Sequence, residues 1–150
     1  MKQFYLAEIV TKDKLIHQGI FCKPSRSGKK AILWVHGLSG KFYGDPMMME
    51  LFADRCEEQG WGFAAFNNRG HDLISSTHTV GGGYFYGGAG YERFEDCIID
   101  IHAAVDFLVS QGFSQVYLVG HSTGALKVAY SEAIKAHKHV AGIILAGGLP

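Results

Sequence analysis

Cysteine is scarce in this 150-residue chain, and the few cysteines that are present lie far apart. Cys22, Cys56 and Cys97 are odd in number and none belongs to a Cys-x-x-Cys pair. This pattern excludes a disulfide framework and a zinc ribbon, and it is typical of proteins in a reducing compartment. We therefore expect a cytoplasmic protein.

A surplus of either charge is also missing. Lysine plus arginine and aspartate plus glutamate number 14 each, so the net charge is zero when histidine is neutral. Without a basic surplus or a polybasic segment, the chain gives no reason to expect a nucleic-acid partner or attraction to a membrane surface.

Long apolar runs are absent as well. No stretch approaches the roughly 20 residues that a helix needs to span a bilayer. The N-terminal apolar run contains Glu8 and is not followed by a small-residue cleavage site, so we expect neither a signal peptide nor a membrane span. Hydrophobic residues at 47% and charged residues at 19% describe an ordinary folded chain. The length predicts a single domain over residues 1–150.

What the chain does contain is a regular alternation of strand and helix patterns. Apolar or alternating runs predict strands at residues 4–10, 15–22, 31–35, 61–66, 116–119 and 140–146. Helical spacing predicts helices at residues 46–59, 92–111 and 125–138, the first with Asp45 as N-cap and Gly60 just past its end. From residue 31 onward the order is β-α-β-α-β-α-β, which predicts an α/β fold: a mostly parallel sheet between two helical layers.

Glycine is abundant, with 20 residues, and many of these lie in one segment. Residues 81–88 read Gly-Gly-Gly-Tyr-Phe-Tyr-Gly-Gly, and residues 74–90 as a whole show no clear periodicity. We interpret this segment as a long surface loop of the kind that can fold over a site.

One stretch carries the clearest chemical pattern. Gly120, Ser122 and Gly124 match G-x-S-x-G between an apolar strand and a helix, which is the context of a nucleophile elbow. In such a turn the serine adopts a strained backbone conformation and exposes its hydroxyl at the carboxyl end of the sheet. The amide of Thr123, at a helix N-terminus, then faces any oxyanion that forms there. The alternative is a glycine-rich loop in which Ser122 only caps a helix.

Three motifs together resemble the α/β-hydrolase family. They are HGLSG at residues 36–40, NNRGHD at residues 67–72 and GHSTG at residues 120–124, and the resemblance covers the N-terminal six-strand portion of that fold. It implies a serine hydrolase that acts on an ester, thioester or related carbonyl bond of a small acyl substrate. Ser122 would be the nucleophile, and the backbone amides of Leu38 and Thr123 would form the oxyanion hole. It implies no cofactor, and no HExxH or similar motif indicates a metal site.

The chain departs from the family in one respect. Family members place the triad acid and histidine after the strands that follow the sixth, often with a helical lid between, and none of these parts is matched here. The general base and its orienting acid therefore have no counterpart, and we expect low activity from these residues alone. If no seventh strand pairs with residues 140–146, this strand forms an apolar sheet edge through which the chain could associate with itself.

No histidine in the chain is expected to serve as the missing base, although His71 and His78 are expected in loops on the side of the sheet that carries Ser122. His121 adjoins Ser122 but, at a strand end, points to the opposite face. His36 is expected to pack or to form a hydrogen bond, and His71 and His78 are expected in surface loops. The remaining histidines are expected to be exposed or on helix faces: His17, His102, His137 and His139.

Three interpretations stay open at this point. The sequence describes a serine hydrolase lacking its C-terminal part, a naturally short α/β-hydrolase-like module that binds a ligand or partner, or a short hydrolase. The last would complete its triad from a loop histidine or from a second chain.

Overall fold

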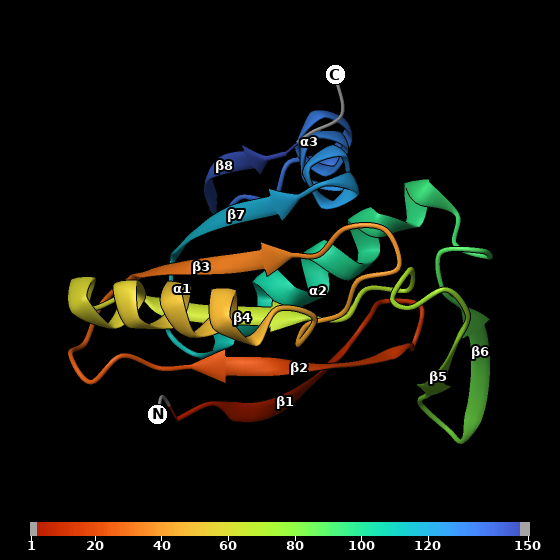
Figure 1. Cartoon of the computed structure of the whole chain (residues 1–150), viewed down its shortest axis with the longest axis horizontal. Helices are drawn as coiled ribbons and strands as arrows, with labels where there is room; N and C mark the ends of the chain where they lie inside the picture. The colour runs from red at the N-terminus through yellow and green to blue at the C-terminus, as the bar shows by residue number, and fades with distance from the viewer. Residues whose placement is uncertain (1–2, 148–150) are drawn as a thin grey trace.

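A six-stranded sheet in the order β1-β2-β4-β3-β7-β8 forms the centre of the computed structural model, which describes residues 3–147 (Figure 1). Its strands are β1 (Tyr5–Val10), β2 (Ile16–Cys22), β3 (Lys30–Val35), β4 (Gly62–Phe66), β7 (Gln115–His121) and β8 (Val140–Ala146). Strand β3 pairs in parallel with β4 and β7, and β8 pairs in parallel with β7. Among the described strands of this sheet, only the β1–β2 and β2–β4 pairs are antiparallel, so the expected mostly parallel sheet is confirmed.

Three α-helices cover the two faces of this sheet. Helix α1 (Pro46–Gln59) lies on one face, and α2 (Cys97–Ser110) lies on the other (Figure 1). Helix α3 (Thr123–Lys135) packs on β7 and β8 and against α2. The three-layer α/β/α arrangement predicted from the sequence is therefore present. The domain limits expected at residues 1 and 150 lie outside the described residues.

The ends of helix α1 are set by the residues that the sequence analysis singled out. The Asp45 side chain accepts a hydrogen bond from the Met48 amide at 3.0 Å, and Gly60 ends the helix in the left-handed conformation with φ 72°. Both features satisfy backbone groups that a helix end leaves without partners. The side chains of Met49, Ala53 and Cys56, spaced three or four residues apart, are buried against the sheet.

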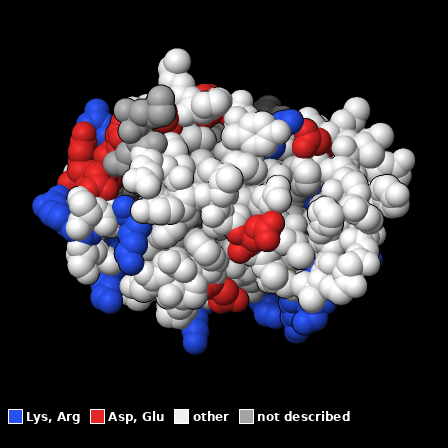
Figure 2. All heavy atoms as spheres, turned by 90° about the horizontal axis from the view of Figure 1, so that it is seen from below, with Lys and Arg blue, Asp and Glu red and all other residues white. Residues whose placement is uncertain are grey.

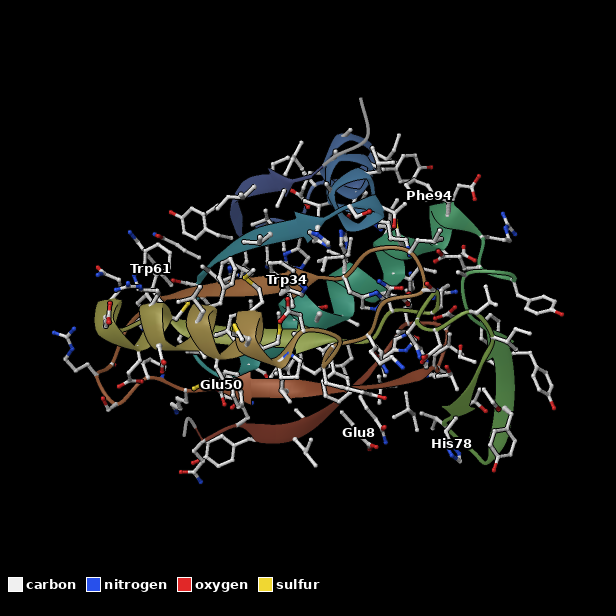
Figure 3. All side chains as sticks on the ribbon, in the orientation of Figure 1. Glu8, Trp34, Glu50, Trp61, His78 and Phe94 are labelled. Atoms are coloured by element: carbon white, nitrogen blue, oxygen red, sulfur yellow. The ribbon has the colours of Figure 1, made fainter. Side chains whose placement is uncertain are left out.

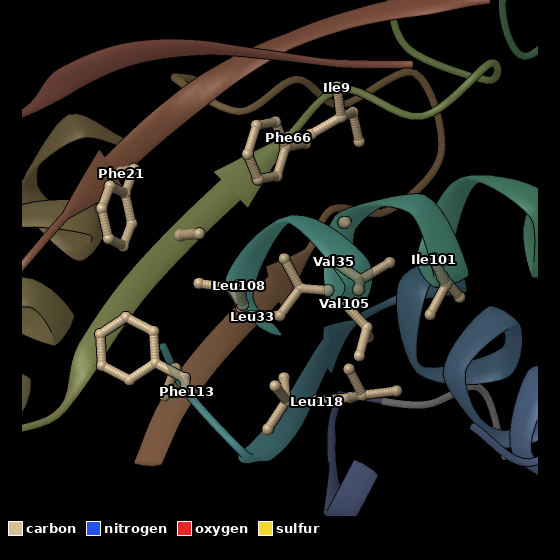
Figure 4. Close-up of a cluster of buried hydrophobic side chains, with 14 of the residues drawn as sticks. Ile9, Phe21, Leu33, Val35, Phe66, Ile101, Val105, Leu108, Phe113 and Leu118 are labelled. Atoms are coloured by element: carbon tan, nitrogen blue, oxygen red, sulfur yellow. The ribbon is translucent and has the colours of Figure 1, made fainter. Parts of the chain in front are cut away.

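The main core lies between the sheet and helices α2 and α3 (Figure 4). Leu33 and Leu118 project from adjacent parallel strands and meet Val105 and Leu108 of α2. A second cluster, which includes Phe63 and Cys56, fills the space under α1. Since β3, β4 and β7 are buried on both faces, their sequences are continuous apolar runs instead of alternating ones.

The segment predicted as a long loop contains a β-hairpin instead. Strands β5 (Ser75–Thr79) and β6 (Gly83–Gly87) pair antiparallel, and the turn between them places Gly81 and Gly82 at φ 99° and 85°. The hairpin stands beyond the carboxyl ends of the central strands (Figure 1). Its inner residue Phe85 lies 5.9 Å from the guanidinium of Arg69, a cation–π contact that ties the hairpin to the sheet.

The helix expected over residues 92–111 starts later than predicted. A 3₁₀ turn, η1 (Phe94–Asp96), leads into α2 at Cys97, because the backbone at Glu92 is held in a turn by a hydrogen bond to Gly88. Helix α3 is also shorter than predicted at one end, since it stops at Lys135, three residues before the expected boundary at residue 138.

Charge is dispersed over the surface. Seen from the β1 side, most of the surface is uncharged, acidic and basic side chains are mixed toward one end, acidic side chains lie near the middle, and further basic ones lie along the lower edge (Figure 2). On this face no basic stripe of the kind that binds nucleic acid is present among the described residues. Within residues 3–147, no helix is both long and apolar enough to cross a bilayer.

Strand β8 is the last strand of the sheet within the described residues. It pairs with β7 alone, and Ile144 and Leu145 are each 52% exposed. An unpaired edge with apolar side chains can template pairing with another chain. Self-association through Val140–Ala146 stays a prediction.

The cap of helix α1 gives a first testable prediction. Replacing Asp45 with alanine should lower the free energy of unfolding by about 1 kcal/mol, because the Met48 amide loses its acceptor. Urea titration measures the difference, and Met47→Ala, at a neighbouring side chain that is 82% exposed, is the matched control. Equal stabilities for the two variants would contradict the capping role.

Candidate active site

The turn between β7 and α3 has the backbone geometry of a tight corner. Strand β7 ends at His121, helix α3 begins at Thr123, and Ser122 between them has φ 56° and ψ −127°. This conformation is sparsely populated by any residue other than glycine and costs on the order of 1–3 kcal/mol. The surrounding structure therefore holds Ser122 in a conformation that the residue does not prefer.

The flanking glycines are required by close packing. A side chain at Gly124 would overlap the carbonyl oxygen of Val35 at the end of β3, and one at Gly120 would overlap the backbone of Gly124 itself. Helix α3 thus begins in direct backbone contact with the carboxyl end of β3. Any larger residue at either position would push the helix away from the sheet.

A second backbone segment, residues 36–40, approaches the same corner from β3. A Cβ atom placed on Gly37 would lie 2.9 Å from the Cβ of Ser122 and 3.4 Å from its Oγ, so the loop abuts the serine side chain. Leu38 follows in this loop and, like Ser122, lines a common pocket. Thr123 occupies the first turn of α3, where amide groups have no partner within the helix.

The pocket beside Ser122 has a volume of about 320 Å³ and a largely apolar wall. Trp34, Met48 and Met49 contribute this wall, and Trp34 lies near the centre of the sheet in Figure 3. The Trp34 ring stacks on the imidazole of His121 at a centroid distance of 5.7 Å. A cleft of this size with a few polar groups is typical of small-molecule sites.

The histidines occupy the positions that the sequence predicted in most cases. His121 stacks on Trp34, and within residues 3–147 no histidine nitrogen forms a hydrogen bond with the Ser122 hydroxyl. His71 pairs with Asp72 at 2.8 Å in the loop after β4. His78 is exposed, but the expectation that it lies in a loop was wrong, since it belongs to strand β5 of the hairpin.

The expectation that His17 is exposed or on a helix face was wrong. Its side chain is fully buried on β2, and its Nε2 lies 3.1 Å from Oδ1 of Asp100. The inward register of β2 at this position explains the burial, since Ile16 and Gln18 on either side are more exposed. His102, His137 and His139, in contrast, are partly exposed as expected.

His36 is buried and satisfied at both ring nitrogens. Its Nδ1 lies 2.9 Å from the Gly37 carbonyl oxygen, and its Nε2 accepts the Asn68 amide at 3.1 Å. These partners assign the neutral tautomer with the proton on Nδ1. Burial, together with the positive charge of Lys127, lowers the pKa of His36 to about 4, so the ring stays neutral at physiological pH.

A buried ion cluster behind the loop after β4 was not predicted from the sequence. Arg69 donates to Asp100 at 2.8 Å through its guanidinium and at 2.9 Å through its backbone amide, and to Asp13 at 3.0 Å. Burial opposes ionisation of Asp100, but His17 and Arg69 outweigh it and lower the pKa of Asp100 to about 2. The only sequence signal was an arginine in the NNRGHD loop directly after a buried strand.

A second unpredicted cluster centres on Lys127 of α3. Its Nζ contacts both carboxylate oxygens of Glu92, at 2.6 and 2.9 Å, and the side-chain oxygen of Asn68 at 3.2 Å. The sequence offers one sign of this cluster: a lysine stands between Leu126 and Val128 on the helix that follows the elbow. Within residues 3–147, no group of three His, Cys, Asp or Glu side chains is arranged to hold a metal ion.

The strain at Ser122 can be measured. Ser122→Gly should be more stable than Ser122→Ala by about 1 kcal/mol, because glycine tolerates a positive φ whereas alanine keeps the strain. Paired urea titrations of the two variants provide the comparison. A greater stability of the alanine variant, as expected at an ordinary helix start, would show that the corner is relaxed.

The buried neutral His36 predicts how stability depends on pH. Its pKa falls from 6.5 in the unfolded chain to about 4 in the fold, so its contribution is complete above pH 6.5 and is lost as the pH falls toward 4. The loss amounts to about 3 kcal/mol. Urea titrations at pH 7, 6 and 5 should show a smaller decline for His36→Gln than for the unaltered protein. The lowered pKa of His102 makes the stability of both proteins decline somewhat as the pH falls. An equal decline in the two proteins would contradict the assignment of a buried neutral His36.

Solved structures share this architecture at low sequence identity. The esterase Pf2001 of Pyrococcus furiosus superposes with a TM-score of 0.72 at 18% identity, over 98% of this chain and 52% of its own. A thermostable carboxyl esterase from Bacillus coagulans gives 0.64 at 19% identity, over 95% of this chain and 44% of its own. An epoxide hydrolase from Vigna radiata gives 0.62 at 16% identity, over 93% and 37%.

The chain thus spans about half the length of these proteins or less, and at such identities the likeness demonstrates the fold alone. Because the fold is shared by ester and epoxide hydrolases, it does not by itself decide the chemistry. No curated protein sequence matches the chain significantly. The sequence model of the serine aminopeptidase S33 family, however, matches residues 26–149, which is most of the chain and includes the elbow, the preceding loop and the pocket. The chain therefore belongs to this family of α/β-hydrolases.

Proposed function

We propose that this chain carries the nucleophile and the oxyanion hole of a serine hydrolase that cleaves an ester, thioester or related carbonyl bond. The observation that supports this most directly is the backbone of Ser122, which has φ 56° and ψ −127° at the β7–α3 corner. Strain of this kind persists only where the structure enforces it, and it clusters at functional sites. A serine that merely capped a helix would have no reason to be strained, and Ser122 makes no side-chain cap bond.

In the proposed reaction, the Ser122 hydroxyl oxygen attacks the substrate carbonyl carbon while its proton passes to the general base, which then protonates the leaving group. The carbonyl oxygen gains negative charge and is stabilised by the amides of Leu38 and Thr123. One such donor is typically worth about 3 kcal/mol in the transition state. Collapse of the tetrahedral intermediate expels the leaving group and leaves an acyl ester on Ser122, which water then hydrolyses.

The general base and its orienting acid are proposed to lie outside residues 3–147. A serine hydroxyl is a weak nucleophile at neutral pH without a base. The described histidines have other partners: His36 with Gly37 and Asn68, His71 with Asp72, and His17 with Asp100. Residues 3–147 alone are therefore expected to show little turnover, and a further part of a longer protein or a second chain is proposed to supply the histidine.

The pocket beside Ser122 supports a small substrate with an apolar acyl group. Its wall includes Trp34, Met48 and Met49, and its lining also includes Lys41, which pairs with Asp72 at 2.5 Å. Because Asp72 neutralises Lys41, the pocket lining within residues 3–147 offers no unpaired lysine or arginine to an acidic substrate. A non-catalytic binding module is the alternative, and the experiment below separates the two.

A fluorophosphonate probe tests the proposed nucleophile in the complete gene product. Ser122 should be covalently phosphonylated, as identified by mass spectrometry of the peptide that contains it, and Ser122→Ala should abolish labelling. Ser76→Ala, at an exposed serine of β5, is the matched control and should be labelled normally. If the unaltered protein remains unlabelled at Ser122 under conditions in which it is folded, the chain acts as a binding module instead.

A further inference from the structure

Lys127 is buried beneath the corner that holds Ser122. It lies on the second turn of α3, and its side chain is 1% exposed. A buried ammonium group is costly unless it is paired and hydrogen-bonded. The partners of the Lys127 ammonium group therefore bear on the role of this residue.

Two acceptors meet the Lys127 ammonium group. Glu92 approaches from the turn before α2, with its oxygens at 2.6 and 2.9 Å, and Asn68 offers its side-chain oxygen at 3.2 Å. Room for the Glu92 carboxylate depends on Gly70, where any Cβ atom would overlap that carboxylate. The Gly70 amide donates to the same Asn68 oxygen at 3.0 Å.

From Asn68 the contacts lead to the loop of residues 36–40. The backbone amide of Asn68 donates to Nε2 of His36 at 3.1 Å, and the protonated Nδ1 of His36 donates to the Gly37 carbonyl at 2.9 Å. The same carbonyl accepts the Gly40 amide at 3.1 Å, which closes the turn that contains Leu38. The bonds from Lys127 to Asn68, from Asn68 to His36 and from His36 to Gly37 are buried, so water does not compete for them.

We propose that Lys127 is a positioning residue that holds the Leu38 amide in place through Asn68, His36 and Gly37. This inference rests on the proposed function, because it assigns Lys127 to the oxyanion hole of that reaction. Lys127 itself touches no substrate. It fixes the Asn68 side chain, which holds the loop after β4 against His36.

Charge neutralisation alone does not account for this arrangement. The Lys127–Glu92 pair would be complete without Asn68, and buried pairs commonly add little net stability over apolar residues of the same size. The third contact instead connects helix α3 to Asn68 in the loop after β4, and the Asn68 backbone amide in turn bonds His36 at the start of residues 36–40. Both halves of the proposed oxyanion hole are thereby fixed to one helix.

The test uses a variant that removes the pair without leaving a lone buried charge. In the complete gene product, Lys127→Met with Glu92→Leu should lower kcat for p-nitrophenyl acetate at least tenfold, with KM changed less than twofold, because an oxyanion contact acts only in the transition state. Exchange of the Gly40 amide, measured by NMR, should accelerate at least tenfold, because the turn loses its support.

Val128→Ala is the control for general destabilisation. It removes buried atoms from the adjacent position of α3 without touching the contacts of Lys127, so kcat and local exchange at Gly40 should match the unaltered protein wherever it is folded. Unchanged Gly40 exchange in the double variant would overturn the positioning role. Absence of esterase activity and of Ser122 labelling in the unaltered protein would overturn the proposed function, while the exchange measurement would still decide whether Lys127 holds the loop.

Discussion

The backbone contact between the start of α3 and the end of β3 is the constraint on which the site depends. It exists because Gly124 has no side chain where the Val35 carbonyl oxygen passes, and because Gly120 leaves room for the helix behind it. A helix brought this close to a parallel strand forces the intervening residue into a positive φ. The geometry of Ser122 thus follows from packing on either side of it more than from any preference of its own.

The buried polar groups behind the sheet obey a second constraint. Each charge taken out of water costs several kcal/mol unless its partners are complete, and here they are largely complete. The loop after β4 supplies Asn68 to one cluster and Arg69 to the other. These two consecutive residues connect the loop to α3 and α2, and Asp100 of α2 extends the second cluster to His17 of β2. The lowered pKa of Asp100 and the raised pKa of Arg69 both reflect this mutual stabilisation. A polar core of this kind fixes one arrangement of the loops, since any shift would leave a buried charge unpaired.

The sheet could be predicted from the sequence because its parallel strands are buried on both faces and give unmistakable apolar runs. The elbow could be located because its glycines are adjacent in sequence to Ser122. The β5–β6 hairpin was missed because Ser75 and Thr77 carry its buried positions, so the strand shows no apolar alternation. The two polar clusters join residues 31 to 83 positions apart, and no local pattern brings such partners together. Whether Leu38 and Thr123 act as oxyanion donors is a matter of chemistry that neither periodicity nor packing decides.

The central strand β3 has a consequence for how the chain acquires its structure. Lys30 of β3 pairs with Gln115 of β7, 85 positions further along the chain. Loop closure over such a separation slows folding, because its entropy is lost before the contact is made. During synthesis on the ribosome, β3 therefore lacks its second neighbour until β7 has emerged, and its apolar side chains are less completely buried in that interval.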